Sequence, residues 1–328
     1  MKKAVGMVLV ALLTISCSSD SQEGNAAYLT GDMIVLEIES GLKMFFLDNK
    51  DGTVSVTYDR SDPMHTSGTT SKNYKGVVTI PGQISFEGNS KIVTGITESA
   101  FMNCGQLQKV IVPATVKSIG KMAFYNCPLL EEVNIPDAVT ELPDYCFYGC
   151  KALRQINLSN QLELIGGSCF SGCTSMAQIE LPNSITRMKP FAFQSCSKLK
   201  QVTLPNNMTE LDDSVFFNCS GLVTAFLPKS MTTLGEGAFA GCRSMVELTL
   251  PESVVNIGAR CFWSLNDAGE PNWKNFTLNV QATVPPVLKA SISNAYERRR
   301  IVVPRGYRDA YLAADYWNEF TQVMERNY

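Results

Sequence analysis

A residue pattern that returns every 23 positions is the strongest constraint on what this chain can fold into. Phenylalanine holds one place in consecutive copies, at 101, 124, 147, 170, 193, 216, 239 and 262. Cysteine follows three residues later in all but the last copy, where Leu265 stands instead. Eight copies in one register, without an insertion, indicate a solenoid in which each turn is one repeat long.

Two spacings of apolar residues alternate inside the unit. Phe124, Cys127 and Leu130 are three apart, which is typical of a 3₁₀ or single helical turn. Val133 and Ile135 are two apart, as in a short strand with one side facing inward. A proline such as Pro136 then ends the strand, because it cannot donate to a ladder. We predict one strand per turn, with the strands stacked into a parallel sheet.

The recurring "L..V.IP..V..IG..AF..C" resembles the BspA-like branch of the leucine-rich repeats, which is found in bacterial surface proteins. The resemblance covers residues 93–265. It implies an α/β leucine-rich-repeat solenoid that is right-handed, with a parallel sheet on the concave face and short 3₁₀ or helical turns on the back. It also implies adhesion, or binding of host matrix or cell-surface proteins. Departures are few: Pro143 and Lys189 replace the Gly after Ile, Val215 replaces the Ala before Phe, and Ser159 replaces the proline.

The segments on either side of the repeats look like caps, which a solenoid needs at both ends. Residues 28–92 form the predicted N-terminal cap, in which Asp51-Gly52 marks a hairpin turn. Within it, 74–96 resembles the first repeat of the family, with an inserted hairpin. Residues 266–328 form the predicted C-terminal cap, and 303–320 resembles the closing strand and helix of the family.

The N-terminus has the pattern of a bacterial lipoprotein signal. Residues 1–16 carry Lys2 and Lys3 before an apolar run that is too short to span a membrane. "LTISC" then resembles a lipobox, which makes Cys17 the lipidated residue. Residues 17–27 read as a polar, flexible tether. The pattern predicts an exported protein, lipid-anchored in the outer membrane and displayed at the cell surface, with no other membrane contact.

Composition argues against two classes of function. A net charge of −3 offers no basic field for nucleic acid. The single histidine, His65, lies in a polar loop, whereas acid–base catalysis and most zinc sites recruit histidine. We therefore expect no enzyme activity, no cofactor and no metal site.

Eleven cysteines in an exported chain would ordinarily indicate disulfides. Here the periodic cysteines fall at core positions, and Cys146, Cys169 and Cys261 stand where other copies have Ala. This interchange favours small, buried, free thiols. Equivalent residues of neighbouring turns come close enough for a disulfide, so pairing between turns stays open as an alternative.

The outward side of the predicted sheet is the candidate binding surface. By strand alternation, the residues that flank each inward residue point outward. One column contains Lys109, Glu132, Gln155, Gln178, Gln201, Thr224 and Glu247. The next contains Ile111, Asn134, Asn157, Glu180, Thr203, Phe226 and Thr249. We predict a non-catalytic, monomeric binding module that contacts an extended protein through this surface. The alternatives left open are a glycan-binding accessory of a nutrient-uptake system, and a sheet that is merely soluble.

Overall fold

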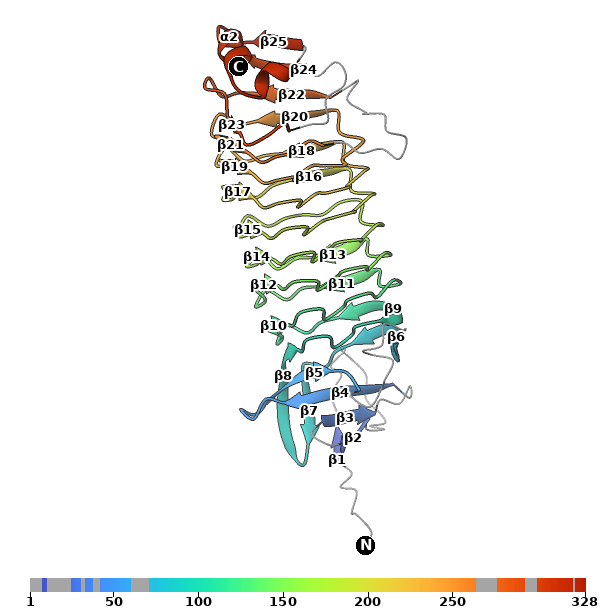
Figure 1. Cartoon of the computed structure of the whole chain (residues 1–328). Helices are drawn as coiled ribbons and strands as arrows, with labels where there is room; N and C mark the ends of the chain where they lie inside the picture. Colours follow the sequence, from blue (N-terminus) through green and yellow to red (C-terminus); the bar gives the residue numbers. More distant parts are fainter. Residues whose placement is uncertain are drawn as a thin grey trace.

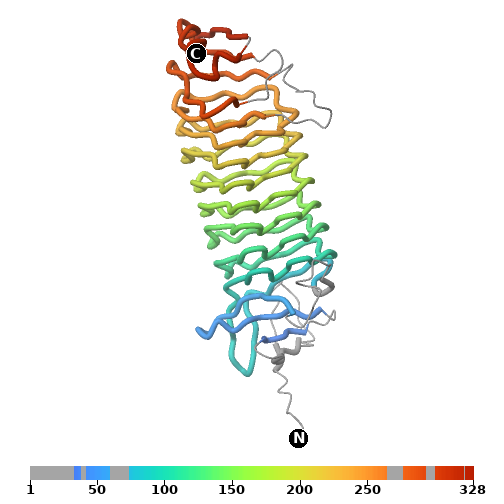
Figure 2. The backbone as a smooth tube through the Cα atoms, in the orientation of Figure 1, coloured from blue at the N-terminus to red at the C-terminus, as the bar shows by residue number. Residues whose placement is uncertain are grey.

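A computed structural model describes residues 8–10, 25–30, 33–37, 42–59, 71–263, 276–292, 300–320 and 322–328. The chain forms an elongated column of stacked turns, with a sheet at the N-terminal end and a small helical cap at the C-terminal end (Figures 1 and 2). Two residues interpreted from the sequence, Cys17 and His65, lie outside the described residues.

The N-terminal cap is a mainly antiparallel sheet that joins the first turns of the column. Its strand order is β1-β2-β3-β4-β5-β8-β10, with β7 paired to β8. The predicted turn at Asp51-Gly52 connects β4 and β5, and the inserted hairpin is the β7–β8 pair. The bounds are β1 (Val8–Val10), β2 (Asn25–Thr30), β3 (Met33–Glu37), β4 (Lys43–Asp48), β5 (Thr53–Thr57), β7 (Gln83–Phe86), β8 (Asn89–Ile96) and β10 (Ser118–Ile119).

The predicted parallel sheet lies along one side of the column. Its strands pair equivalent positions of successive units, so that Glu132 lies opposite Gln155 and Gln201 opposite Thr224. It consists of three ladders: β6-β9-β11-β13, β16-β18 and β20-β22-β24-β25. The bounds are β6 (Ser71–Thr79), β9 (Cys104–Ile111), β11 (Glu132–Asn134), β13 (Gln155–Asn157), β16 (Gln201–Thr203), β18 (Thr224–Phe226), β20 (Glu247–Leu250), β22 (Thr277–Val280), β24 (Arg300–Pro304) and β25 (Gln322–Arg326).

A second parallel ladder, absent from the prediction of one strand per turn, runs along another side. Its strands are two residues long and include Leu142 and Ile165, which point into the core. The ladder stops at two places. Between β10 and β12, Pro143 has no N–H to make the bond that the equivalent Gly166 donates to the Leu142 carbonyl. It stops again between β15 and β17. The further bounds are β12 (Glu141–Leu142), β14 (Leu164–Ile165), β15 (Arg187–Met188), β17 (Glu210–Leu211), β19 (Thr233–Leu234), β21 (Asn256–Ile257) and β23 (Val287–Leu288).

The third side of each turn differs from the predicted 3₁₀ or helical segment. Within the described residues 97–263 this side contains tight turns and no helix. Met122 and Asn126 have φ of 55°, a left-handed conformation, and Phe124 donates to Cys146 of the next turn at 2.9 Å. Alternate N–H groups therefore bond across turns, which a continuous helix would prevent.

The core is one continuous column of apolar side chains. Phe124 and Phe147 are fully buried, and their ring centroids lie 5.0 Å apart at 2°. The periodic thiols lie beside this stack: Cys150 Sγ donates to the Phe124 carbonyl at 3.1 Å. The ten cysteines of the described chain are free and buried, as the Cys–Ala interchange predicts.

The C-terminal cap contains the predicted strand and helix. α2 (Arg308–Ala313) and the 3₁₀ helix η2 (Trp317–Glu319) follow β24. Tyr311, Trp317 and Phe320 are buried. Trp317 Nε1 donates to the Pro286 carbonyl, and Tyr311 Oη to the Ala282 carbonyl, both at 2.7 Å. These aromatic residues cover the last turn. No helix within the described ranges combines the length and apolarity needed to cross a membrane.

Candidate binding surface

The exposed side of the first parallel sheet is here called the strand face; it consists of the outward residues of 109–111, 132–134, 155–157, 178–180, 201–203, 224–226 and 247–249. The flanking residues are exposed or half-buried along its whole length, while the central Val133, Val202 and Leu248 are buried. Two outward positions of the strand face are apolar: Ile111, which is 40% exposed, and Phe226, which is 52% exposed. The alternation expected from the sequence therefore describes this surface.

At the N-terminal end of the strand face, polar side chains are already engaged by the fold. Lys109 forms an ion pair with Glu132. The Asn134 amide accepts from the Val112 N–H at 2.9 Å and donates to the Val112 carbonyl at 2.7 Å. This side chain bridges two turns by binding both polar groups of one peptide residue. Asn134 therefore has less hydrogen-bonding capacity left for a partner than Asn157, its equivalent in the next turn.

In the middle of the strand face the main-chain ladder is interrupted. Gln178-Ile179-Glu180 has the same alternation as its neighbours but forms no strand. Within the described chain, no N–H or C=O group of residues 178–181 makes a hydrogen bond to the backbone. On either side, β13 pairs only with β11 and β16 only with β18. Two strand edges thus face an unpaired segment.

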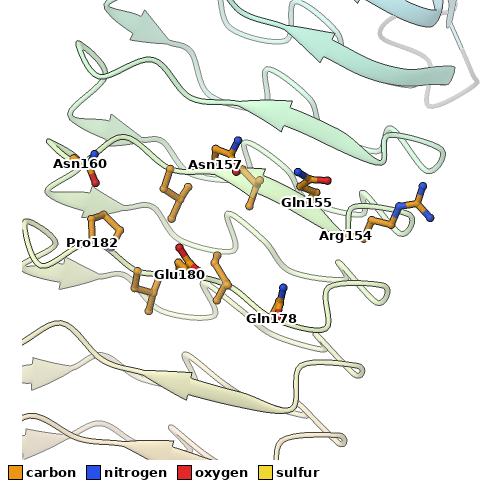
Figure 3. A pocket seen from close by; sticks show the side chains of 11 residues that line it. Arg154, Gln155, Asn157, Asn160, Gln178, Glu180 and Pro182 are labelled. Carbon is orange, nitrogen blue, oxygen red and sulfur yellow. The ribbon is translucent and has the colours of Figure 1, made fainter.

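Two clefts flank this segment. The larger has a volume of about 690 Å³ and lies between 154–160 and 178–182 (Figure 3). The smaller, of about 430 Å³, lies between 178–183 and 201–206. A third, of about 350 Å³, is lined by Lys109, Glu132 and Asn134 among others. The structure thus gathers Gln155, Asn157, Gln178 and Glu180 around one cleft, with Gln201 and Thr203 beside the next, and leaves Thr224, Phe226, Glu247 and Thr249 farther along the column.

The floor of the larger cleft was not anticipated from the sequence. Ile156, Leu158, Ile179 and Leu181 pack against the core but are only partly buried, whereas Val133 and Ile135 keep 4% and 5% of their surface exposed. The cleft therefore has an apolar floor and amide-bearing walls. Ser159, which stands in place of the repeating proline next to Leu158, was the one departure in the sequence at this turn.

A second feature missed from the sequence is a group of tyrosines on the third side of the column. The rings of Tyr125 and Tyr148 stack with centroids 4.9 Å apart at 7°. Tyr145, 40% exposed, meets Tyr148 edge-on at 6.0 Å. Burial, and the neighbouring Tyr148 and Tyr145, raise the pKa of Tyr125. The signal was present as Tyr at equivalent positions of two successive units.

The periodic thiols of the described residues lie in surroundings that favour their protonated form. Burial is the main cause that raises the pKa of Cys127 and Cys173 well above the ordinary thiol value, which leaves them protonated at neutral pH. Among the described residues there is no group of His, Cys, Asp and Glu that could hold a metal ion.

Comparison with known proteins gives one family and several structural relatives. The family model described as "BspA type Leucine rich repeat region" matches six copies, over residues 83–186 and 140–268. A leucine-rich repeat protein from Bacteroides ovatus is 23% identical, with 86% of this chain and 75% of that chain covered and a TM-score of 0.57. The leucine-rich repeat protein of T. pallidum is 28% identical, with 61% and 86% covered and a TM-score of 0.52. No curated protein matches the chain.

Proposed function

The chain belongs to the BspA-type leucine-rich-repeat family, and from that premise we propose that it is a surface lipoprotein that binds an extended protein through its strand face. Proteins of this family generally mediate protein binding or surface interactions. The proposal includes the finer fold, a right-handed solenoid of 23-residue turns without enzymatic activity. The pairing of equivalent positions in successive units supports that repeat length.

The observation that carries the proposal is the character of the strand face. It presents exposed amides, hydroxyls and carboxylates over seven successive turns, interrupted by open clefts. Such a surface offers contact area and hydrogen bonds to an elongated partner, which is what protein interfaces require. Catalysis, by contrast, needs titratable groups that converge in a pocket.

Anchoring and display rest on the sequence. Cleavage before Cys17 would remove β1 and leave β2 as the outer strand of the N-terminal sheet. The protein is then a lipid-anchored monomer in the outer membrane, with the column facing outward. Cys17→Ala is expected to release it from membranes, and treatment of intact cells with protease is expected to remove it. Membrane retention of the variant would contradict the lipid anchor.

The function is tested by screening residues 18–328 against immobilised matrix proteins and glycan arrays. For a protein ligand, charge reversal at Glu132 or Glu180 is expected to weaken binding by roughly tenfold. Glu141→Lys, an exposed reversal on the second ladder, is the matched control and is expected to leave binding unchanged. Equal loss with all three reversals would move the binding site off the strand face. Binding to no partner in either screen would contradict the function.

A specific observation supports glycan binding as the second candidate. The group formed by Tyr125, Tyr145 and Tyr148 supplies stacked and exposed aromatic rings, on which apolar faces of sugars can pack. Binding that is confined to the glycan array, lost in Tyr145→Ala and unaffected by the reversals at Glu132 and Glu180, would favour this reading.

A further inference from the structure

The interruption at residues 178–181 combines three features, of which the first distinguishes it from the other outward segments of the strand face. Its main-chain groups are unpaired within the described chain, its apolar residues are half-buried, and it lies between two clefts. Elsewhere the turns remain joined. Phe170 stacks on Phe193 with centroids 5.2 Å apart, and Phe193 donates to the Val215 carbonyl of the next turn at 2.9 Å. In the second ladder β14 pairs with β15, although β15 does not pair with β17. The turns here are therefore joined through the core and the third side, and are unpaired at the strand face.

We propose that the larger cleft accepts an extended peptide segment of the partner protein, which adds main-chain hydrogen bonds to the free edge of β13. This inference rests on the proposed function and names the part of the strand face that carries it. Unpaired strand edges bind extended chains because the N–H and C=O groups are already aligned for a further strand. The volume of about 690 Å³ lies within the range of ligand sites.

The walls and floor of the cleft fit a peptide in particular. An amide side chain can satisfy both polar groups of a peptide residue, as Asn134 does for Val112 within the fold. The amides of Gln155, Asn157 and Gln178 make no hydrogen bond in the described chain and line the cleft. Ile156 and Ile179 offer apolar contact to every second side chain of an extended segment.

Charge adds a preference for the peptide sequence. Arg154 at one end of the cleft is paired with Glu131, whereas the Glu180 carboxylate has no partner among the described residues (Figure 3). A basic side chain on the peptide would therefore meet a free carboxylate. We expect peptides that bind this cleft to be enriched in Lys or Arg at one position, flanked by alternating apolar residues.

The test uses a phage-displayed library of linear decapeptides selected on residues 18–328. The best peptide is then synthesised in its natural form and with alternate backbone nitrogens methylated. Methylation that removes the donors of one edge is expected to weaken binding by at least about tenfold. Glu180→Gln is expected to weaken binding and abolish the enrichment in basic residues. Glu141→Gln, an exposed carboxylate on the second ladder, is the matched control and is expected to leave peptide binding unchanged.

The failures of the two proposals are distinguishable. Equal affinity of the methylated peptide, or equal loss with Glu141→Gln, overturns the strand-addition site. So does a selection that yields no peptide. The proposed function stands in these cases if the matrix-protein screen gives a ligand that is sensitive to Glu132 or Glu180. Failure of both screens and of the peptide selection overturns both proposals.

Discussion

The turn containing 132–135 and the turn containing 178–181 have nearly the same residue pattern and different strand faces. In the first, Val133 and Ile135 are buried, and the main chain is bonded to both neighbouring turns. In the second, Ile179 and Leu181 are half-buried, and the main chain is bonded to neither turn at these residues. Beneath both, the phenylalanine and cysteine columns continue without a break.

This difference separates two roles that one repeat performs. Phe124 and Phe170 are equally buried. The core and the third side therefore hold the turns together whether the strand face is paired or unpaired. The short strands are then the part of the repeat that can vary its pairing at little cost to the stack. A solenoid that is a sum of units and nearest-neighbour contacts allows such local freedom.

The largest effect is expected from the phenylalanine column. Phe170→Ala, under the open turn, and Phe124→Ala, under the closed turn, should each lower the free energy of unfolding by about 3–5 kcal/mol. Both rings are fully buried and stacked on two neighbours. Urea denaturation measures the loss. A much smaller cost for Phe170→Ala would mean that the opening extends into the core. Phe226→Ala, on the strand face, should cost less than about 0.5 kcal/mol.

A smaller effect is expected from the thiols, as a dependence of stability on pH. Burial raises the pKa of Cys127 and Cys173 in the folded state, so the folded protein holds these protons more tightly than the unfolded chain. The protonated thiols make their full contribution to the free energy of unfolding below the ordinary thiol pKa of about 8.5. This contribution is lost as the pH rises toward the higher pKa that the thiols have in the folded state. The free energy of unfolding should therefore fall as the pH rises from about 7.5 to about 9.5, the range in which the thiols of the unfolded chain ionise.

The variants Cys127→Ala and Cys173→Ala test whether a thiol near the closed turn and a thiol near the open turn contribute equally to the pH dependence of stability. Each should reduce the pH dependence of urea unfolding by the same amount, because both thiols are buried and donate to phenylalanine carbonyls of earlier turns. A weaker reduction for Cys173→Ala would indicate that water reaches the core through the cleft.

The smallest effect distinguishes two asparagines of one column. Asn134→Ala removes both hydrogen bonds to Val112 and should lower the free energy of unfolding by about 1–2 kcal/mol. Asn157→Ala should change it by less than about 0.5 kcal/mol, because the Asn157 amide makes no hydrogen bond in the described chain. Thermal unfolding of both variants measures the contrast. Equal costs would show that Asn157 is also used by the fold.

Much of the fold could be predicted because each inward position has a residue type that repeats. Val133 and Ile135 indicated the first sheet, and Tyr311, Trp317 and Phe320 indicated the closing helix. The second ladder was missed because its strands are two residues long, too short for an alternation to appear. The left-handed turns had a signal that was not used: Asn, Gly or Ser precedes each periodic cysteine, as at Asn126 and Gly149.

The candidate surface was predictable only as a pattern of exposure. Alternation placed Gln155, Asn157 and Glu180 on the outside, and they are exposed. It could not show that the ladder stops at 178–181, because Gln178-Ile179-Glu180 alternates just as Gln201-Val202-Thr203 does. Pairing between strands depends on how neighbouring turns stack, and that depends on contacts 23 residues apart rather than on the local sequence.

Amide hydrogen exchange of the free protein, compared between residues 133–135 and 179–181, measures directly whether the strand face is open. Strong protection is expected in the first segment, where the main chain is paired, and exchange close to that of an unstructured peptide is expected in the second. Protection at 179–181 equal to that at 133–135 would show a closed ladder and contradict the open strand face.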